Sequence, residues 1–243
     1  MPGKAYIGTS GFMYDDWRGV LYPEGVAKKK WLEYYSTQFD TVELNNTFYG
    51  MPRAHICQNW KERTGEGFCF VVKLNRQITH RHKLLHVEPA LEIFLRGIET
   101  LEEKLGPILV QLPPHFAPDA QRLENFLAGC PDQRRWAVEF RDPAWLNDEV
   151  YEVLKRHQAA LVIHDLIPDH PQVVTADWTY YRFHGPQGQG AAGKYTSPML
   201  RAAARRIKPH LKAGRDVYAY FNNDVRGNAV VNALELRRHV AGT

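Results

Sequence analysis

The chain has 243 residues, of which 44% are hydrophobic and 24% are charged, and its formal net charge is +4. This is the composition of an ordinary globular protein, and a mildly basic charge weakly favours an anionic ligand. Three widely spaced cysteines exclude a zinc ribbon and a disulfide framework, and no run approaches the ~18 apolar residues of a membrane span. We therefore expect a cytoplasmic protein that has no membrane partner.

Eight short segments show the pattern of β-strands. Most are apolar at consecutive positions instead of alternating, which is typical of strands covered on both faces. The segments are residues 5–9, 41–44, 68–74, 108–112, 136–140, 160–164, 180–184 and 217–221.

Helical patterns lie between these strands. The clearest is 89–105, where leucine, isoleucine and phenylalanine recur at helical spacing, and Asn147 and Ser197 stand where N-caps are expected. The predicted helices are 29–38, 56–63, 89–105, 119–128, 148–157, 198–211 and 227–240.

Strand and helix alternate almost without exception, which favours a parallel sheet. Eight such units in about 240 residues predict a single domain over residues 1–243 with the (β/α)₈ fold, commonly called a TIM barrel. The segment "LIPDHPQVVTADWT" has two prolines and no helical pattern, so we expect the helix between strands six and seven to be missing or short. An open doubly wound sheet is the alternative, although no GxGxxG motif follows the first strand.

Polar residues gather at the carboxyl ends of the predicted strands, and in a parallel barrel these ends share one face, where active sites lie. The stretch "WAVEFRDPAW" illustrates this, because Glu139 sits within an apolar strand and Arg141 follows it. Alternation places Glu139 and Arg141 on one side, and likewise Arg182 and His184. A lone buried charge is costly, so these groups must pair with one another or with a ligand. A structural salt-bridge network that closes the barrel is the alternative interpretation.

The glycine-rich loop 185–198 follows the seventh strand, and "NNDVRGN" follows the eighth. Barrels often bind phosphate with these two loops, through backbone N–H groups and a helix N-terminus. Lys194 offers a positive charge there, and Asn222 and Asn223 offer hydrogen bonds. The competing interpretation is a mobile lid or a flexible connecting loop that binds nothing.

The predicted acid/base groups are Glu43, Glu139, Asp165 and His184, with His184 suited to proton transfer near neutral pH. The predicted substrate-binding groups are Asn45, Lys73, Gln111, Arg141, Arg182, Lys194, Asn222 and Asn223. We expect no cofactor. A divalent metal held by Glu43, Glu139, Asp165, His184 and His80 is the alternative, which the nearby Arg141 and Lys73 oppose.

With these residues in view, the sequence resembles the domain-of-unknown-function 72 family, also called YecE-like. The resemblance runs through nearly the whole chain and is carried by "IGTSGFMYDDWRGVLYP", "FDTVELNNTFYGMP", "FVVKLNRQITH", "ILVQLPP", "AVEFRDPAWL", "DWTYYRFHG" and "VYAYFNND". It implies a TIM barrel and supplies no reaction. Phe12 and Met13 stand where Trp and Ser are usual in the family.

Three functional hypotheses follow. The first is an enzyme, whether hydrolase, lyase or isomerase, that acts by acid/base chemistry on a small anionic, phosphate- or sugar-like molecule at the barrel mouth. The second is a nucleic-acid-binding or processing protein related in fold to barrel endonucleases, and the basic segment "LRAAARRIKPHLKAGR" favours it. The third is a non-catalytic protein that binds a metabolite in the same place. The sequence predicts no oligomeric state.

Overall fold

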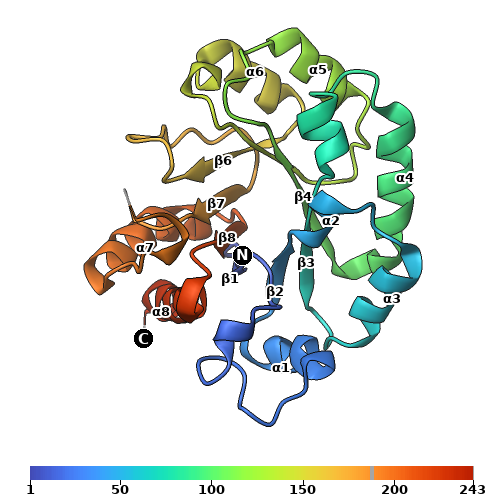
Figure 1. The fold of residues 1–243 in the computed structure, drawn as a ribbon. Helices are drawn as coiled ribbons and strands as arrows, with labels where there is room; N and C mark the ends of the chain where they lie inside the picture. Colours follow the sequence, from blue (N-terminus) through green and yellow to red (C-terminus); the bar gives the residue numbers. More distant parts are fainter. Residues whose placement is uncertain (187–188, 243) are drawn as a thin grey trace.

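The structure, a computed structural model, describes residues 1–186 and 189–242. Over these residues eight parallel strands form one sheet in the order β1-β8-β7-β6-β5-β4-β3-β2, and Figure 1 shows helices arranged outside them. The predicted barrel is confirmed. The strands are β1 (Ala5–Thr9), β2 (Thr41–Leu44), β3 (Cys69–Lys73), β4 (Leu105–Gln111), β5 (Trp136–Glu139), β6 (Ala160–His164), β7 (Thr179–Phe183) and β8 (Val217–Phe221).

The helices surround the strands in chain order. Residues 165–178, between β6 and β7, contain no helix, as the sequence predicts. No helix in the described part of the chain has the length and apolar character needed to cross a lipid bilayer. The helices are α1 (Trp31–Gln38), α2 (Asn46–Tyr49), α3 (Ala54–Glu62), α4 (Glu88–Ile98), α5 (Ala120–Ala128), α6 (Asp148–Arg156), α7 (Ser197–Lys212) and α8 (Asn228–Ala241).

The barrel closes between β1 and β2 through a tyrosine hydroxyl. These two strands meet in one β-bridge, between Ser10 and Glu43. Below it, the hydroxyl of Tyr35 on α1 accepts a hydrogen bond from the Thr9 N–H at 3.1 Å and donates one to the Thr41 carbonyl at 3.0 Å. A side chain therefore completes the backbone hydrogen bonding that a strand pair would otherwise supply.

Two expectations about helix ends are wrong. The helix predicted over 89–105 ends at Ile98 and continues as tighter 3-10 turns, in which Glu102 has a φ of 48°. Its last leucine, Leu105, begins β4, because an apolar residue serves a buried strand as well as a helix face.

Ser197 is the first residue of α7 and not its N-cap, and its hydroxyl accepts a hydrogen bond from the Arg201 side chain at 2.7 Å. The Asn147 cap is confirmed, since its side chain accepts from the N–H of residue 150.

The barrel interior is apolar in its lower half and polar towards the mouth. Large aromatic side chains from β7, from the residue before it and from β8 fill the lower half, where alanines on β5 and β6 leave room for them. The aromatic members are Trp178, Tyr180, Tyr218 and Tyr220, and the alanines are Ala137 and Ala160. Above this layer every strand end carries polar residues, and these form the candidate site.

Candidate functional site

Arg182 lies at the centre of the polar layer and joins three strands. From β7 its guanidinium donates to both oxygens of Glu43 on β2, with Nη2 at 2.7 Å from Oε1 and Nε at 3.0 Å from Oε2. Its Nη1 donates to Glu139 Oε2 on β5 at 2.7 Å. All three side chains are buried, and both glutamates have no exposed surface. The sequence analysis expected such charged groups to pair with one another or with a ligand, and the structure brings these three together.

Glu43 is fully hydrogen-bonded by the protein. Besides the two bonds from Arg182, Oε1 accepts from the Ser10 hydroxyl at 2.6 Å and Oε2 accepts from the Tyr180 hydroxyl at 2.6 Å. Burial alone would raise the pKa of Glu43, but Arg182 and these donors lower it below its usual value. A carboxylate has about four lone-pair sites, and all are occupied here. The arrangement suits Glu43 to orienting Arg182 more than to exchanging protons.

Glu139 is shared by two arginines. Its Oε1 accepts from Arg141 Nε and its Oε2 from Arg182. Burial would raise the pKa of Glu139, but the two guanidinium groups hold it well below its usual range, so the carboxylate is ionised near neutral pH. Neither Nη of Arg141 donates to another described residue, and this side chain keeps 23% of its surface exposed. Both Nη groups of Arg141 are therefore without a hydrogen-bond partner in the described chain, on a side chain that is partly exposed.

His184 is a neutral imidazole with one free nitrogen. Asn222 Nδ2 lies 3.2 Å from His184 Nδ1, and an amide NH₂ group donates, so Nδ1 accepts and Nε2 carries the hydrogen. Nε2 is buried without a hydrogen-bond partner among the described residues and lies 3.6 Å from Glu139 Oε2. Burial and the nearby Arg182 lower the pKa of His184. His184 Nε2–H is thus a donor without a hydrogen-bond partner in the described part of the chain.

Asp165 holds the backbone after β7. Its Oδ1 accepts from the His184 N–H at 2.9 Å, and its Oδ2 accepts from the Tyr195 hydroxyl. Tyr195 in turn accepts from the Gly185 N–H at 2.7 Å. Both oxygens of Asp165 are thus engaged in fixing the loop that carries His184.

The predicted phosphate loop lies partly outside the described residues, which omit Gln187 and Gly188. In the described part, Asn223 is completely buried and donates to the Gly193 carbonyl at 2.8 Å and to the Asn232 side chain at 3.0 Å. Asn223 therefore ties the loop to α8. Lys194 is exposed on the same loop.

Lys73 ends β3 and is a buried lysine without a partner. Only 9% of its surface is exposed, and its ammonium makes no hydrogen bond or ion pair with another described residue. Its Nζ lies 4.1 Å from the centre of the Phe48 ring. Burial and, next, the Arg182 charge lower the pKa of Lys73 to about 7. A substantial fraction of this side chain is therefore a neutral amine at physiological pH.

A second buried lysine, Lys104, has a hydrogen-bond acceptor for each donor of its ammonium group. Lys104 is 7% exposed, and its Nζ donates to the carbonyls of Lys61 and Thr64, each at 2.7 Å, and to the Thr64 hydroxyl at 3.1 Å. Three donors meet three acceptors, which makes it a structural cation. Lys73 has the same burial and none of these bonds.

Two further predicted residues keep unused polar groups near the strand ends. Gln111 on β4 is 7% exposed, and its amide makes no hydrogen bond with a described residue. Asn45, after β2, has a buried Oδ1 without a partner in the described chain. Buried polar groups normally find a partner, so these two are available to water or to a ligand.

Tyr180 and Ser10 belong to the site, although the sequence analysis did not select them. Tyr180 lies two residues before Arg182 on the same side of β7, so the alternation that paired Arg182 with His184 applies to it too. Ser10 follows β1 beside a glycine, and it meets Glu43 only because the two ends bridge. No group of three or more His, Cys, Asp or Glu side chains that could hold a metal ion occurs within residues 1–186 and 189–242.

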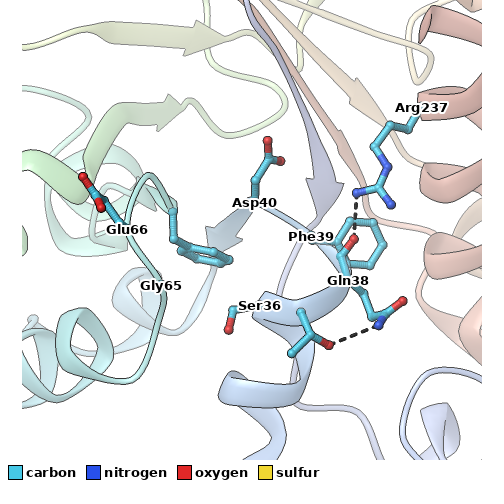
Figure 2. A pocket seen from close by; sticks show the side chains of 9 residues that line it. Ser36, Gln38, Phe39, Asp40, Gly65, Glu66 and Arg237 are labelled. Atoms are coloured by element: carbon cyan, nitrogen blue, oxygen red, sulfur yellow. Dashed lines mark hydrogen bonds between the residues drawn. The ribbon is translucent and has the colours of Figure 1, made fainter.

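Two surface cavities lie away from these residues. One of about 310 Å³ is lined by residues that precede β2 and β3 and by one residue of α8 (Figure 2). There Arg237 donates to the Gln38 carbonyl at 2.7 Å, and Phe39, Asp40 and Glu66 also line the cavity. The other, of about 570 Å³, is lined by residues of α2, α3 and α4 and of the loop between α2 and α3. None of the predicted site residues lines either cavity.

Residues 6–243 match the family described as "Protein of unknown function DUF72". This chain belongs to the DUF72 family. The DUF72 chain is 29% identical to the UPF0759 protein YunF of Bacillus subtilis (strain 168), over 95% of this chain and 93% of YunF. It is 32% identical to the UPF0759 protein YecE of Escherichia coli (strain K12), over 68% of this chain and 60% of YecE.

The crystal structure of a DUF72 family protein from Thermotoga maritima MSB8 is similar to this DUF72 chain, with a TM-score of 0.89 and 30% identity. The alignment covers 98% of this chain and 99% of that one. The family and its barrel are therefore shown, while the names of these relatives specify no substrate.

Proposed function

We propose that this DUF72 protein is an enzyme that binds a small anionic, phosphate- or sugar-like molecule at the mouth of the barrel and acts on it by acid/base chemistry. The observation that carries this proposal is the charge of the buried layer. Glu43 and Glu139 pair with Arg182 and Arg141, so Lys73, when it is protonated, adds a positive charge that forms no ion pair with a described residue. An uncompensated buried cation is costly, and an anionic ligand beside it would remove that cost.

The proposed roles follow from the polar side-chain groups that have no hydrogen-bond partner in the described chain. Arg141 has an open guanidinium edge, which suits the planar, two-point recognition of a carboxylate or phosphate. Gln111 and Asn45 offer neutral hydrogen bonds that would orient hydroxyl groups. His184 offers its Nε2–H to an oxygen that gains negative charge during the reaction, while the ionised Glu139 beside it stabilises positive charge or accepts a proton.

A binding experiment tests the first part of the proposal. Sulfate, inorganic phosphate and a panel of phosphorylated sugars are titrated into the protein by calorimetry and by thermal shift. We expect Arg141→Gln and Lys73→Met each to weaken binding by about ten-fold or more, as for loss of one charged contact. Arg205→Gln, which removes an exposed positive charge from α7, is the matched control and should bind as the wild type does. Equal binding by the wild type and all three variants would show that the anion does not bind at the barrel mouth.

A second experiment separates an enzyme from a metabolite-binding protein that uses the same mouth. Glu139→Gln keeps the shape of the side chain and removes its charge. For any ligand found above, NMR spectra of the ligand are followed with wild type and with Glu139→Gln. An enzyme converts the ligand only with the wild type, whereas an unchanged ligand in both mixtures would favour a non-catalytic binding protein.

A further inference from the structure

We propose that the amine of Lys73 forms an imine with the carbonyl carbon of an anionic aldehyde or ketone, which makes Lys73 the covalent attachment point for the substrate. This inference rests on the proposed function of the mouth and narrows its ligand to carbonyl compounds. Nothing in the acid/base scheme above requires a primary amine, and an arginine could also supply the positive charge that binds an anion. The presence of an unpaired lysine is what calls for a further role.

The first argument is the geometry of the amine. Lys73 ends a barrel strand, is almost completely enclosed, and its Nζ has no acceptor among the described residues. Lys104 shows that this chain can give a buried ammonium three acceptors. An amine that donates no hydrogen bonds keeps its lone pair accessible when it is deprotonated, which is the state that attacks a carbonyl.

The second argument is the set of charges that face Lys73 from the elements around it. Burial lowers the pKa of Lys73 most, the positive groups on β7 and after β5 lower it further, and the carboxylates of β2 and β5 oppose this only in part. The pKa of about 7 that results gives Lys73 roughly a thousand-fold larger neutral fraction at pH 7 than an ordinary lysine has. The groups are Arg182, Glu139, Glu43, Arg141 and, on the 77–81 helical turn, His80.

The chemical step is balanced without a further reactant. The Nζ lone pair attacks the carbonyl carbon, and the pair of electrons of the C=O π bond moves to the oxygen. The nitrogen then gives up both its protons to that oxygen, which leaves as water, and a C=N bond remains. The imine withdraws electrons from the neighbouring carbon, so a C–H or C–C bond there becomes easier to break. Isomerisation and carbon–carbon cleavage are the reaction classes that use this effect.

The experiment traps the imine by reduction. The full-length protein is incubated separately with pyruvate, glyoxylate, dihydroxyacetone phosphate and pyridoxal 5′-phosphate, and sodium borohydride is added. Borohydride transfers a hydride to the imine carbon, which leaves a stable secondary amine that peptide mass spectrometry assigns to a lysine. We expect the label of at least one compound to fall mainly on Lys73, to be blocked by sulfate, and to be absent from Lys104.

Dependence on pH gives a readout that a surface lysine does not share. Labelling of Lys73 should reach a plateau with a midpoint near pH 7, whereas labelling of exposed lysines should continue to rise towards pH 10. Lys73→Arg keeps the positive charge and cannot form an imine, so it should bind sulfate and lose the label. Because the labelled position is read from the wild type, the test does not require the Lys73→Arg variant to fold.

The outcomes distinguish the two proposals. Sulfate binding at the mouth with no label on Lys73 from any of the four compounds overturns the imine and leaves the anion-binding enzyme standing. A label on Lys73 that sulfate does not block keeps the imine and contradicts the anionic ligand. If the wild type neither binds sulfate at the mouth nor carries a label on Lys73, both the imine and the anion-binding enzyme are contradicted.

Discussion

Arg182 donates to Glu43 through two nitrogens and so fixes the plane of its guanidinium across the barrel. The third nitrogen is then directed at Glu139. Because all three groups are buried, the network is well ordered but sensitive to the loss of any member.

Replacement of Arg182 tests that sensitivity. Arg182→Met leaves two buried carboxylates without the cation they share, and we expect the free energy of unfolding to fall by about 3–5 kcal/mol. Urea unfolding followed by circular dichroism measures this change. Arg205→Gln on the exposed face of α7 should change the stability by less than about 0.5 kcal/mol. A loss below about 1 kcal/mol for Arg182→Met would mean that the network behaves like a surface ion pair.

Lys73 should reduce stability near neutral pH. Its pKa is about 7 in the folded protein and 10.5 as the ordinary value, so the unfolded chain binds more protons between these two pH values. The contribution of Lys73 to stability therefore becomes more favourable as pH rises from 7 to 10, and the full penalty is present below pH 7. The shift corresponds to a penalty on the order of 5 kcal/mol.

We accordingly expect Lys73→Met to unfold at a higher temperature than the wild type at pH 6, with the difference shrinking towards pH 10. Thermal unfolding of both proteins across this range gives the difference directly and cancels the titration of other groups. A Lys73→Met protein less stable than the wild type at pH 6 would show that the ammonium has partners and stabilises the fold.

Anion affinity should depend on pH through the same lysine. The protonated amine attracts an anion and the neutral amine does not, so sulfate binding should weaken as pH rises through 7 to 8. Sulfate is chosen because its own charge is constant in this range. Calorimetry in buffers of different ionisation enthalpy should also detect proton uptake on binding. In Lys73→Met both effects should vanish, and a pH dependence that persists there would assign them to another group.

The Tyr35 hydroxyl contributes two of the hydrogen bonds that join β1 to β2. Tyr35→Phe leaves the Thr9 N–H and the Thr41 carbonyl without their shared partner, and an unsatisfied buried group costs about 1–3 kcal/mol. We expect a loss of about 2–4 kcal/mol by urea unfolding and faster hydrogen exchange at β1 and β2. Tyr34→Phe is the matched control, since this neighbouring hydroxyl bonds to no described residue. Equal effects of the two substitutions would contradict the bridging role of Tyr35.

Much of the fold can be predicted from the sequence because burial on both faces leaves a simple pattern. The strands 5–9, 41–44, 160–164 and 217–221 begin and end as predicted, since each is a short, largely apolar run with polar residues close to both ends. The helix predicted over 89–105 is too long, because the leucines of the 3-10 turns and of β4 continue its spacing by coincidence. Apolar periodicity does not distinguish these states where one element follows another directly.

The sequence identifies most residues of the candidate site, but it does not show which of these side chains form hydrogen bonds or ion pairs with one another. Alternation along β5 and β7 places Glu139, Arg141 and Arg182 towards the interior, but it does not say which carboxylate takes which guanidinium. Tyr180 has the sequence signal of a core aromatic, and only the three-dimensional position of Glu43 makes it a hydrogen-bond donor. The missing partner of Lys73 also depends on how all its neighbours pair. That information lies in distances between strands, which a single sequence does not encode.

The Arg182 network also constrains the order in which the barrel can assemble. Glu43 and Arg182 are 139 positions apart, so their ion pair forms only after most of the chain has been synthesised and most strands have docked. Contacts between such distant segments are slow to form, because a long loop must close first. Until β7 arrives, two carboxylates face an unfinished interior and favour water over burial. Water can therefore leave the interior completely only in the last steps of folding, so the segment from β7 onward is needed for the stability of the rest.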